Sequence, residues 1–173
     1  MAVMLKEGFP TDDMVAYHEA KAKGVDVLLG PTINIHRHPL GGRHFECFSE
    51  DPFLTGKIAI DYVNGVQSRE VAACLKHFVG NDTEFERYTI SSNIDEKTLR
   101  EIYLLPFEMA VKEANAQVVM SAYNKLNNIY CSSDEKLLIN ILKNNTQIVI
   151  FSLLLLFSYF SIFFSYNILK IIF

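Results

Sequence analysis

Polar residues whose types could do chemistry gather in a few short stretches of this sequence. The longest stretch, Gly30 to Pro52, carries two Arg, three His and three acidic residues together with three Pro. A loop of this length within a compact domain is usually functional, and its restricted and aromatic residues argue against disorder. Further candidates are Lys76, His77, Arg87 and Tyr123, which follow or end apolar segments. We therefore expect a binding site built on loops.

A guanidinium, an ammonium and an imidazole are groups that suit a sugar. A sugar presents neighbouring hydroxyls, to which Arg43 and Lys76 can donate hydrogen bonds, while a neutral His77 can both donate and accept them. A phosphate site would instead be expected to use a Gly-rich turn before a helix. No such turn is present in the sequence, so a sugar is favoured over a phosphate.

Apolar segments with alternating strand and helix patterns must position these groups. Leu54, Ile58, Tyr62 and Val66 recur every fourth residue and predict the apolar face of one helix. Strands that alternate with helices imply a parallel sheet, in which ligands meet the loops at the carboxyl ends of the strands. The sequence thus predicts an α/β fold with its site at that edge. The expected helices are 11–23, one that starts after Ser49 or Asp51, 99–114 with a kink at Pro106, and 134–142, and the expected strands are 25–29, 71–79 and 117–122.

Charge and cysteine content exclude several classes of partner. The formal net charge of −4 leaves no basic surface for nucleic acid. The three cysteines are widely spaced and form no paired motif, so neither a disulfide framework nor a zinc knuckle is expected. His36, His38 and His44 are spaced as metal ligands can be, but no carboxylate or thiol motif completes a site, and we expect no metal. The first ten residues lack the long apolar core of a secretory signal, so export is not expected.

Several long motifs, in a fixed order, resemble glycoside hydrolase family 3 and, within it, the β-glucosidases of fungi and plants. The resemblance covers roughly Lys6 to Leu142, and a series of motifs is more specific than one short pattern. The matching stretches are Gly30–Ile35, Arg37, Pro39–Arg43, Phe45–Glu46, Phe48–Pro52, Lys76–Phe78, Asn81–Asp82, Glu86–Arg87, Leu99–Leu104, Pro106–Phe107 and Ser121–Asn124.

The resemblance implies a partial (β/α)8 barrel of the TIM type, which in this family precedes an α/β sandwich domain. It also implies hydrolysis of terminal, non-reducing β-glucosyl residues with retention, without a cofactor, so that a β-glucoside or oligosaccharide is the expected substrate. By motif match it places Arg43, Lys76, His77 and Tyr123 in the glucose subsite, with Arg87 as a less closely matched candidate.

Simpler interpretations of some of these residues stay open. Arg43 and Glu46 could form only an ion pair that holds the loop in place. Lys76 and His77 could lie where a strand runs out into solvent, although two polar residues after seven mostly apolar ones argue against this.

The sequence departs from the family pattern at the residues that break the bond. A retaining glycosidase needs two carboxyl groups close together. In the family the nucleophile is an Asp in a Ser-Asp-Trp motif, shortly beyond the helix that here ends at Leu142. This sequence has no acidic residue after Glu135 and no Trp. We therefore assign no catalytic residue and expect the chain to be inactive by itself.

The composition changes near Lys143. From Asn144 to the end there is no Gly, Ala, Pro, Asp, Glu, Arg or His, so we divide the chain into a partial barrel domain at 1–143 and an apolar tail at 144–173. The segment 148–169 is long and apolar enough to cross a bilayer as a helix. A membrane-anchored, non-catalytic sugar-binding protein is thus the alternative function. The other interpretation is translation through an intron or a shifted frame, because the tail is rich in residues with A- and T-rich codons.

Overall fold

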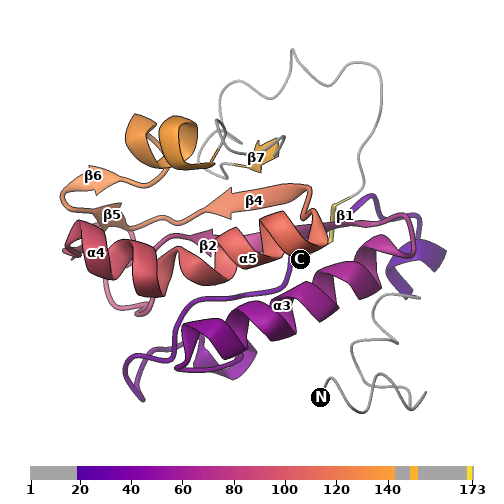
Figure 1. Cartoon of the computed structure of the whole chain (residues 1–173), viewed down its shortest axis with the longest axis horizontal. Coiled ribbons are helices and arrows are strands. Elements are labelled where there is room, and N and C mark those ends of the chain that lie inside the picture. Colours follow the sequence, from indigo (N-terminus) through magenta and orange to yellow (C-terminus); the bar gives the residue numbers. More distant parts are fainter. Residues whose placement is uncertain (1–18, 143–148, 152–170, 173) are drawn as a thin grey trace.

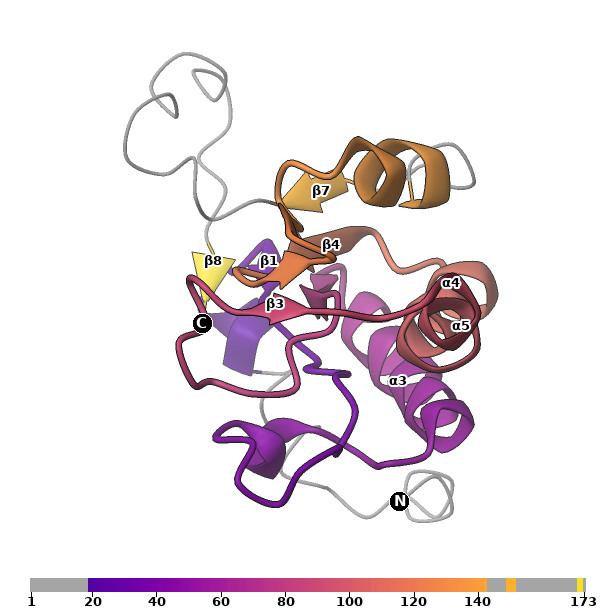
Figure 2. The ribbon, with the colours of Figure 1, turned by 90° about the vertical axis from the view of Figure 1, so that its left-hand side faces the viewer.

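The main sheet of this chain is parallel. The computed structural model describes residues 19–142, 149–151 and 171–172. The strands of the main sheet are β1 (Val27–Leu28), β2 (Ala72–Phe78), β4 (Val118–Ser121), β7 (Val149–Phe151) and β8 (Ile171–Ile172). Their order is β7-β4-β2-β1-β8, and every neighbouring pair runs parallel (Figures 1 and 2). The predicted α/β class with parallel strands is therefore confirmed.

Helices cover one face of this sheet, where α3 and α5 lie side by side beneath β2 and β4 in Figure 1. Asp51 begins α3, since its carboxylate accepts hydrogen bonds from the amides of Phe53 (2.8 Å) and Leu54 (2.9 Å). The predicted kink near Pro106 is seen as a change from π-helix to α-helix just before that residue. The helices are η1 (His44–Glu46), α3 (Pro52–Gln67), α4 (Glu96–Thr98), η2 (Leu99–Tyr103), α5 (Leu105–Ala114) and η3 (Lys136–Leu142).

The buried face of α3 is not the one that periodicity predicted. Leu54 is exposed, and only Val66 of the four predicted residues is fully buried. The face against α5 is built from smaller side chains, which let the two helices approach closely. At Gly56 an added Cβ would lie only 2.6 Å from the sulfur of Met109 on α5. The buried residues of α3 are Thr55, Gly56, Ala59, Val63 and Val66.

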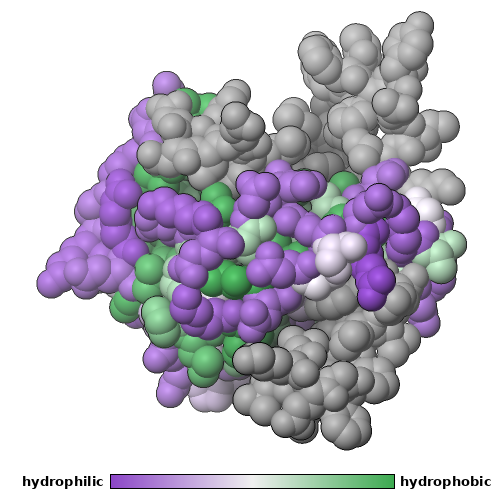
Figure 3. All heavy atoms as spheres, turned by 45° about the vertical axis from the view of Figure 1, so that its right-hand side comes forward, coloured by the Kyte–Doolittle hydropathy of each residue, from purple (hydrophilic) through white to green (hydrophobic). Residues whose placement is uncertain are grey.

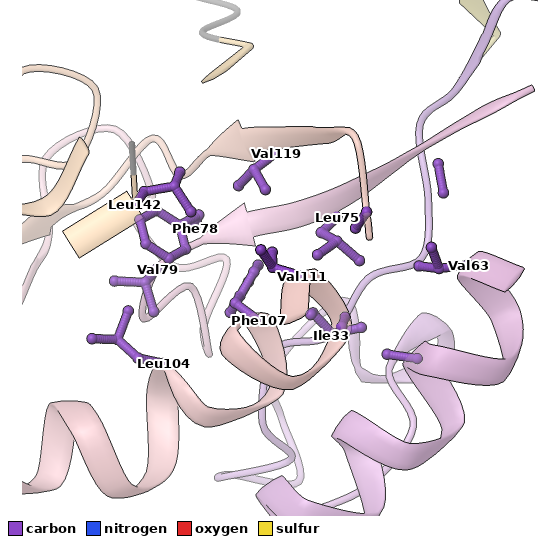
Figure 4. Packing of buried hydrophobic residues seen from close by; sticks show 14 of the residues in the cluster. Ile33, Val63, Leu75, Phe78, Val79, Leu104, Phe107, Val111, Val119 and Leu142 are labelled. Atoms are coloured by element: carbon purple, nitrogen blue, oxygen red, sulfur yellow. The ribbon is translucent and has the colours of Figure 1, made fainter. Parts of the chain in front are cut away.

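The core lies between the sheet and these helices (Figure 4). Phe78 at the end of β2 packs edge to face on Phe107 of α5, with ring centroids 5.1 Å apart. Leu75 and Val119, from neighbouring strands, are completely buried beside them. On the face drawn in Figure 3, hydrophilic residues cover much of the described surface and apolar residues show between them. The apolar side chains that hold β2 against α5 also hold the end of β2, which carries Lys76 and His77.

A second, smaller sheet occupies segments for which the sequence predicted only loops and turns. It consists of β3 (Ser91–Ser92), β5 (Lys125–Leu126) and β6 (Ile129–Tyr130) in the order β3-β5-β6. Strands β5 and β6 form an antiparallel hairpin. The two residues between them, Asn127 (φ 49°) and Asn128 (φ 72°), both have positive φ, as tight hairpin turns require.

The predicted apolar helix at 144–173 is not supported. Its described parts are the strands β7 and β8, and the other tail residues lie outside the described part of the chain. Within the described residues, no helix is long and apolar enough to span a bilayer. Of the predicted helix at 11–23, residues 19–22 are helical and residues 11–18 are not described. The division at residue 143 stays a prediction.

Candidate functional site

The five predicted binding residues lie in β2 near its carboxyl end and in the segments that follow β1, β2 and β4. Lys76 and His77 are part of β2 near its end, and Tyr123 follows the end of β4. Arg43 directly precedes η1, and Arg87 belongs to the segment between β2 and β3. Because β2 and β4 pair in parallel, their carboxyl ends share one edge of the sheet (Figure 1).

Glu46 joins the loop before α3 to strand β2. One carboxylate oxygen accepts a hydrogen bond from Arg43 Nε at 2.5 Å, and the other accepts one from Thr32 Oγ1 at 2.5 Å. Lys76 Nζ lies 3.7 Å from this second oxygen. Burial by itself would raise the pKa of Glu46, but the hydrogen bonds from Arg43 and Thr32 hold that pKa below its usual value. Glu46 therefore stays ionised between two cations.

Arg43 is more than a partner of Glu46, since its Nη1 lies 2.9 Å from Nε2 of His77. A guanidinium can only donate, so His77 Nε2 must be the acceptor, and the ring proton is on Nδ1. That nitrogen lies 3.4 Å from Oδ1 of Asn34. Burial, with the charges of Arg43 and Lys76, lowers the pKa of His77 to about 3. His77 is thus a neutral imidazole that orients Arg43.

The backbone of His77 is fixed by Asn34. The amide of His77 donates to Asn34 Oδ1 (2.9 Å), and Asn34 Nδ2 donates to the carbonyl of His77 (3.0 Å). Both residues are buried, so this pair satisfies polar groups that would otherwise be costly to bury. The neighbouring ammonium of Lys76 is also largely buried, and burial together with the charge of Arg43 lowers its pKa, against the opposing effect of Glu46.

Arg87 and Tyr123 form the other side of the site. Glu84 accepts a hydrogen bond from Arg87 Nη1 (2.7 Å) and one from Asn81 Nδ2 (3.2 Å). Asn81 Nδ2 also lies 3.5 Å from Nδ1 of His77, a contact without a hydrogen bond that places this side next to the first. The guanidinium of Arg87 lies over the ring of Tyr123, 5.4 Å from its centroid. Burial and the neighbouring Tyr88 raise the pKa of Tyr123, so its phenol remains a hydrogen-bond donor.

Asp82 differs from the other carboxylates of the site. Its Oδ1 is buried and has no hydrogen-bond partner among the described residues. Burial raises the pKa of Asp82 to about 6, against the opposing hydrogen bond from the amide of Ile35 and the charge of Arg37. Asp82 and Arg37 both line a cavity of about 380 Å³ that extends to Tyr103 and β3.

Two of the three loop histidines stack on each other, with ring centroids of His36 and His44 4.9 Å apart. His36 Nε2 lies 2.9 Å from the carbonyl oxygen of His44, and His38 Nδ1 accepts from the amide of Leu40. Among the described residues, no three His, Cys, Asp or Glu side chains are grouped so that they could hold a metal ion.

Sequence reasoning missed the residues that orient the five predicted ones. Glu46 was identified only as a possible ion-pair partner, whereas it contacts three side chains. Thr32 and Asn34 carried a signal, because they alternate with apolar residues along an extended segment that leads into the loop. No residue spacing in the sequence indicates the contacts of Asn81 and Glu84, since these contacts depend on how the segment after β2 folds.

Comparison with known proteins matches most of this chain to a family of hydrolases. The family model for the glycosyl hydrolase family 3 N terminal domain matches residues 12–152. A beta-glucosidase of Rhizobium radiobacter is 60% identical over 125 residues, which make up 72% of this chain and 15% of that protein. A thermostable beta-glucosidase B of Acetivibrio thermocellus is 55% identical over 126 residues, or 73% of this chain and 17% of that protein. The chain thus spans less than a fifth of these relatives.

Solved structures agree in fold with this match. The structure of beta-glucosidase 3B from Thermotoga neapolitana in complex with glucose superposes with a TM-score of 0.78 at 48% identity, covering 81% of this chain and 20% of that one. Beta-glucosidase from Kluyveromyces marxianus in complex with glucose superposes with a TM-score of 0.78 at 47% identity, covering 81% of this chain and 17% of that one. Both are described as glucose complexes, and each is much longer than this chain.

Proposed function

Because this chain belongs to glycosyl hydrolase family 3, we propose that it forms the glucose-binding part of a β-glucosidase, as a segment of a (β/α)8-type barrel. The substrate class is a β-glucoside or oligosaccharide with a terminal, non-reducing glucosyl residue. In relatives of this kind the reaction retains the anomeric configuration and uses two carboxyl groups. Our proposal for this chain by itself covers binding of the glucosyl residue. It does not include cleavage of the glycosidic bond, which we assign to the longer relatives.

The observation that carries this proposal is the convergence of Arg43, Lys76 and His77 at the end of β2, connected through Asn81 to Arg87 and Tyr123. Arg43, Lys76, Arg87 and Tyr123 are hydrogen-bond donors under ordinary conditions, which suits a ligand covered in hydroxyls. The distances that connect them are 2.9 Å between Arg43 and His77 and 3.5 Å between His77 and Asn81.

The structure supports a division of roles within the set. Arg43 and Lys76 supply charged donors, and charge-assisted hydrogen bonds are about twice as strong as neutral ones. Both ring nitrogens of His77 already face protein groups, so we assign it to positioning Arg43. Tyr123 supplies a phenol and a ring face, and Glu46 supplies the negative charge that both cations contact.

The test is binding of methyl β-D-glucopyranoside to the purified chain, measured by ligand-observed NMR, with methyl β-D-galactopyranoside as the epimeric control. We expect saturable binding of the glucoside that Arg43→Ala weakens by at least tenfold, as loss of a charged hydrogen bond predicts. Arg69→Ala, at an exposed arginine beyond α3, is the matched control. Glucoside binding that survives Arg43→Ala unchanged would contradict the proposal.

The alternative, a membrane-anchored protein that binds sugar without cleaving it, shares the same site. Of its proposed anchor at 148–169, only Val149–Phe151 is described, and those residues form a β-strand. The described part of the chain therefore offers no observation in favour of this alternative.

A further inference from the structure

We propose that residues 152–170 cross the open face of the main sheet, the face turned away from α3 and α5, and bury it in place of spanning a membrane. The proposal goes beyond sugar binding, since it concerns how the sheet is completed and not the site at its edge. It gives a partner within the chain to an apolar segment for which the sequence predicted only a membrane helix or a mistranslated stretch.

The open face of the sheet carries an apolar cluster of its own. Side chains alternate between the two faces along a strand. On β2, Leu75 packs towards Phe107 of α5, whereas the preceding Cys74 belongs to the separate cluster. On β4, Val119 belongs to the core on the helix side and Met120 to the separate cluster. This open-face cluster consists of Leu29, Cys74, Val118 and Met120, with Val27 and Ala72 packed against it.

The open-face cluster is buried although no described helix contributes a side chain to it. All its members lie in β1, β2 or β4 or, for Leu29, directly after β1. Cys74 is completely buried, and Met120 is only 6% exposed. The core on the opposite face, in contrast, takes side chains from α3, α5 and η3. Because parallel sheets are covered on both faces, the open face needs a cover from another part of the chain.

The order of the strands indicates which connection can supply this cover. Strands β1, β2, β4 and β7 follow one another across the sheet in one direction, and α3 and α5, which connect the first three, lie on one face (Figure 2). Strand β8 pairs in parallel with β1 at the opposite edge. The chain between Phe151 and Ile171 therefore returns across the whole sheet in the opposite direction.

The hand of parallel crossovers then selects the face. Connections between parallel strands of one sheet are right-handed in about 98% of cases. A right-handed crossover that runs in one direction across a sheet lies on one face, and a right-handed crossover that runs back lies on the other. The connection from β7 to β8 is thereby assigned to the face opposite α3 and α5, which is the face that carries the open-face cluster.

The connection is long enough for this path. A crossover between parallel strands needs about a dozen residues or more, and 152–170 exceeds that length. Neighbouring strands lie about 4.8 Å apart, so the four spacings from β7 to β8 amount to about 19 Å along the sheet. A helix formed by 152–170 would be about 28 Å long, which is sufficient to span that width.

The connection also has one side suited to water. Ser158, Ser161 and Ser165 recur at the spacing of one side of a helix. A helix that covers a sheet needs such a side, because only its opposite side is buried. The side opposite these serines carries Leu156, Phe160 and Phe163.

Cys74 reports directly on the cover, because its thiol is part of the open-face cluster. The experiment treats the purified 173-residue chain with N-ethylmaleimide under native conditions and follows the labelling of each cysteine by mass spectrometry. Cys131 is completely buried in the core on the helix side and serves as the internal control. We expect both thiols to be labelled at least about a hundredfold more slowly than in the urea-unfolded chain.

The test variant combines Leu156→Asp with Phe160→Asp. Two charges on the side that faces the sheet are too costly to bury there, so the segment should leave the open face. We expect the labelling of Cys74 to become at least about tenfold faster, while the labelling of Cys131 stays as slow as in the parent chain.

The matched control combines Ser158→Asp with Ser165→Asp, which adds the same charge to the same segment on its opposite side. Cys74 should remain as protected as in the parent chain. Flotation of the parent chain with phosphatidylcholine vesicles provides the second measurement, and we expect no chain to float with the vesicles.

Each other outcome overturns the proposal. Unchanged labelling of Cys74 in Leu156→Asp/Phe160→Asp would show that another part of the chain covers the face, and protection that rises with chain concentration would show that a second copy does. Flotation that this variant abolishes would show that the segment enters a bilayer. If both cysteines become reactive in this variant, Phe160→Ser alone is measured, and equal labelling of the two thiols in it also overturns the proposal. Glucoside binding has no part in these measurements, so this proposal and the proposed function can fail separately.

Discussion

Glu46 is the residue on which the two cations of the site depend. It accepts one hydrogen bond from Arg43 and one from Thr32 and lies 3.7 Å from Lys76 Nζ. Two positive charges this close would repel each other in a partly buried site if no carboxylate stood between them. The spacing of Arg43 and Glu46 in the sequence indicated a possible ion pair, but the sequence could not show that Lys76, thirty residues away, is the third partner.

We expect Glu46→Gln to lower the free energy of unfolding by about 1–3 kcal/mol at pH 7, because it leaves charged donors without an ionised acceptor. The folded-state pKa of Glu46 is depressed, so its contribution is present above the unfolded pKa of about 4.5 and is lost as the pH falls through the folded pKa. Urea unfolding at pH 7 and pH 3 measures this. Glu50→Gln, at an exposed residue of the same loop, is the control and should change little.

The variant also tests how Glu46 acts on its neighbour. Burial already lowers the pKa of Lys76, and Glu46 opposes that shift. In Glu46→Gln the pKa of Lys76 should therefore fall further, which NMR of lysine labelled at the ε-carbon can follow, with Lys76→Arg for assignment. A pKa for Lys76 that does not change would show that the carboxylate has no electrostatic part in the site.

His77 should remain neutral throughout the range in which histidines ordinarily titrate. Its pKa is lowered to about 3 by burial and by Arg43 and Lys76, and its proton is on Nδ1. The unfolded chain takes up this proton near pH 6.5, so the contribution of His77 to stability is complete above that pH and is lost as the pH falls from about 6.5 towards 3. Long-range ¹H–¹⁵N spectra should show an unchanged Nδ1–H tautomer between pH 8 and 5, and a midpoint near 6.5 would contradict the geometry.

At the scale of elements, α3 shows where a periodic pattern identifies a helix but not its buried side. The pattern Leu54, Ile58, Tyr62, Val66 has the right spacing, yet the helix turns a face of small residues towards α5. Hydropathy favours the larger residues, whereas close packing between two helices favours glycine and alanine. The existence and start of the helix were predictable from Asp51 and Pro52, and its orientation depended on α5, which no local pattern specifies.

Gly56→Val on α3 should destabilise the fold by about 1–3 kcal/mol, because added carbons must displace Met109 or separate α3 from α5. Thermal or urea unfolding measures the change. Gly65→Val, at the other and partly exposed glycine of the same helix, receives the same change in helix propensity and should stay within about 0.5 kcal/mol of the parent protein. Equal effects at both positions would show that helix propensity, and not packing against α5, determines the result.

The β5–β6 hairpin was predictable in part. Two asparagines between short β-prone segments are a signal for a tight turn with positive φ, and both have it here. Its pairing with β3 was not predictable, because two-residue strands leave no pattern in a sequence. As a consequence Tyr88 and Tyr130 were not recognised as neighbours, since neither lies in a predicted helix or strand.

At the scale of the whole molecule, the order of strands explains why the site could be located before any contact was known. Parallel strands place their carboxyl ends at one edge, so polar residues that follow β2 and β4 must meet there. The convergence of Lys76, His77 and Tyr123 was predictable for this reason. The hydrogen bonds that hold the site together were not, because they depend on distant partners such as Asn34, which binds the backbone of His77, and Glu84, which binds Arg87.

The same arrangement limits the chemistry of the chain. Of the carboxylates in the loops of the site, Glu46 and Glu84 each hold an arginine, and neither is free to act as a nucleophile or a general acid. Burial raises the pKa of Asp82 to about 6, and Asp82 lines a cavity together with Arg37. The last acidic residue of the sequence is Glu135. We therefore assign no pair of carboxyl groups for retaining hydrolysis to the described part of the site.

The 173-residue chain, assayed alone, should accordingly hydrolyse p-nitrophenyl β-D-glucopyranoside at least about four orders of magnitude more slowly than a complete relative such as the Rhizobium radiobacter beta-glucosidase. Groups that only position the glucosyl residue contribute binding, while protonation of the leaving group and attack at the anomeric carbon need the two carboxyl groups. Release of p-nitrophenolate, followed over hours with chain purified to constant specific activity, measures the rate. Arg43→Ala and Asp82→Asn, purified in the same way, distinguish contaminants from the chain itself. Turnover that disappears in Asp82→Asn would show that this buried carboxyl takes part in hydrolysis, and would refute the assignment of no catalytic residue to this chain.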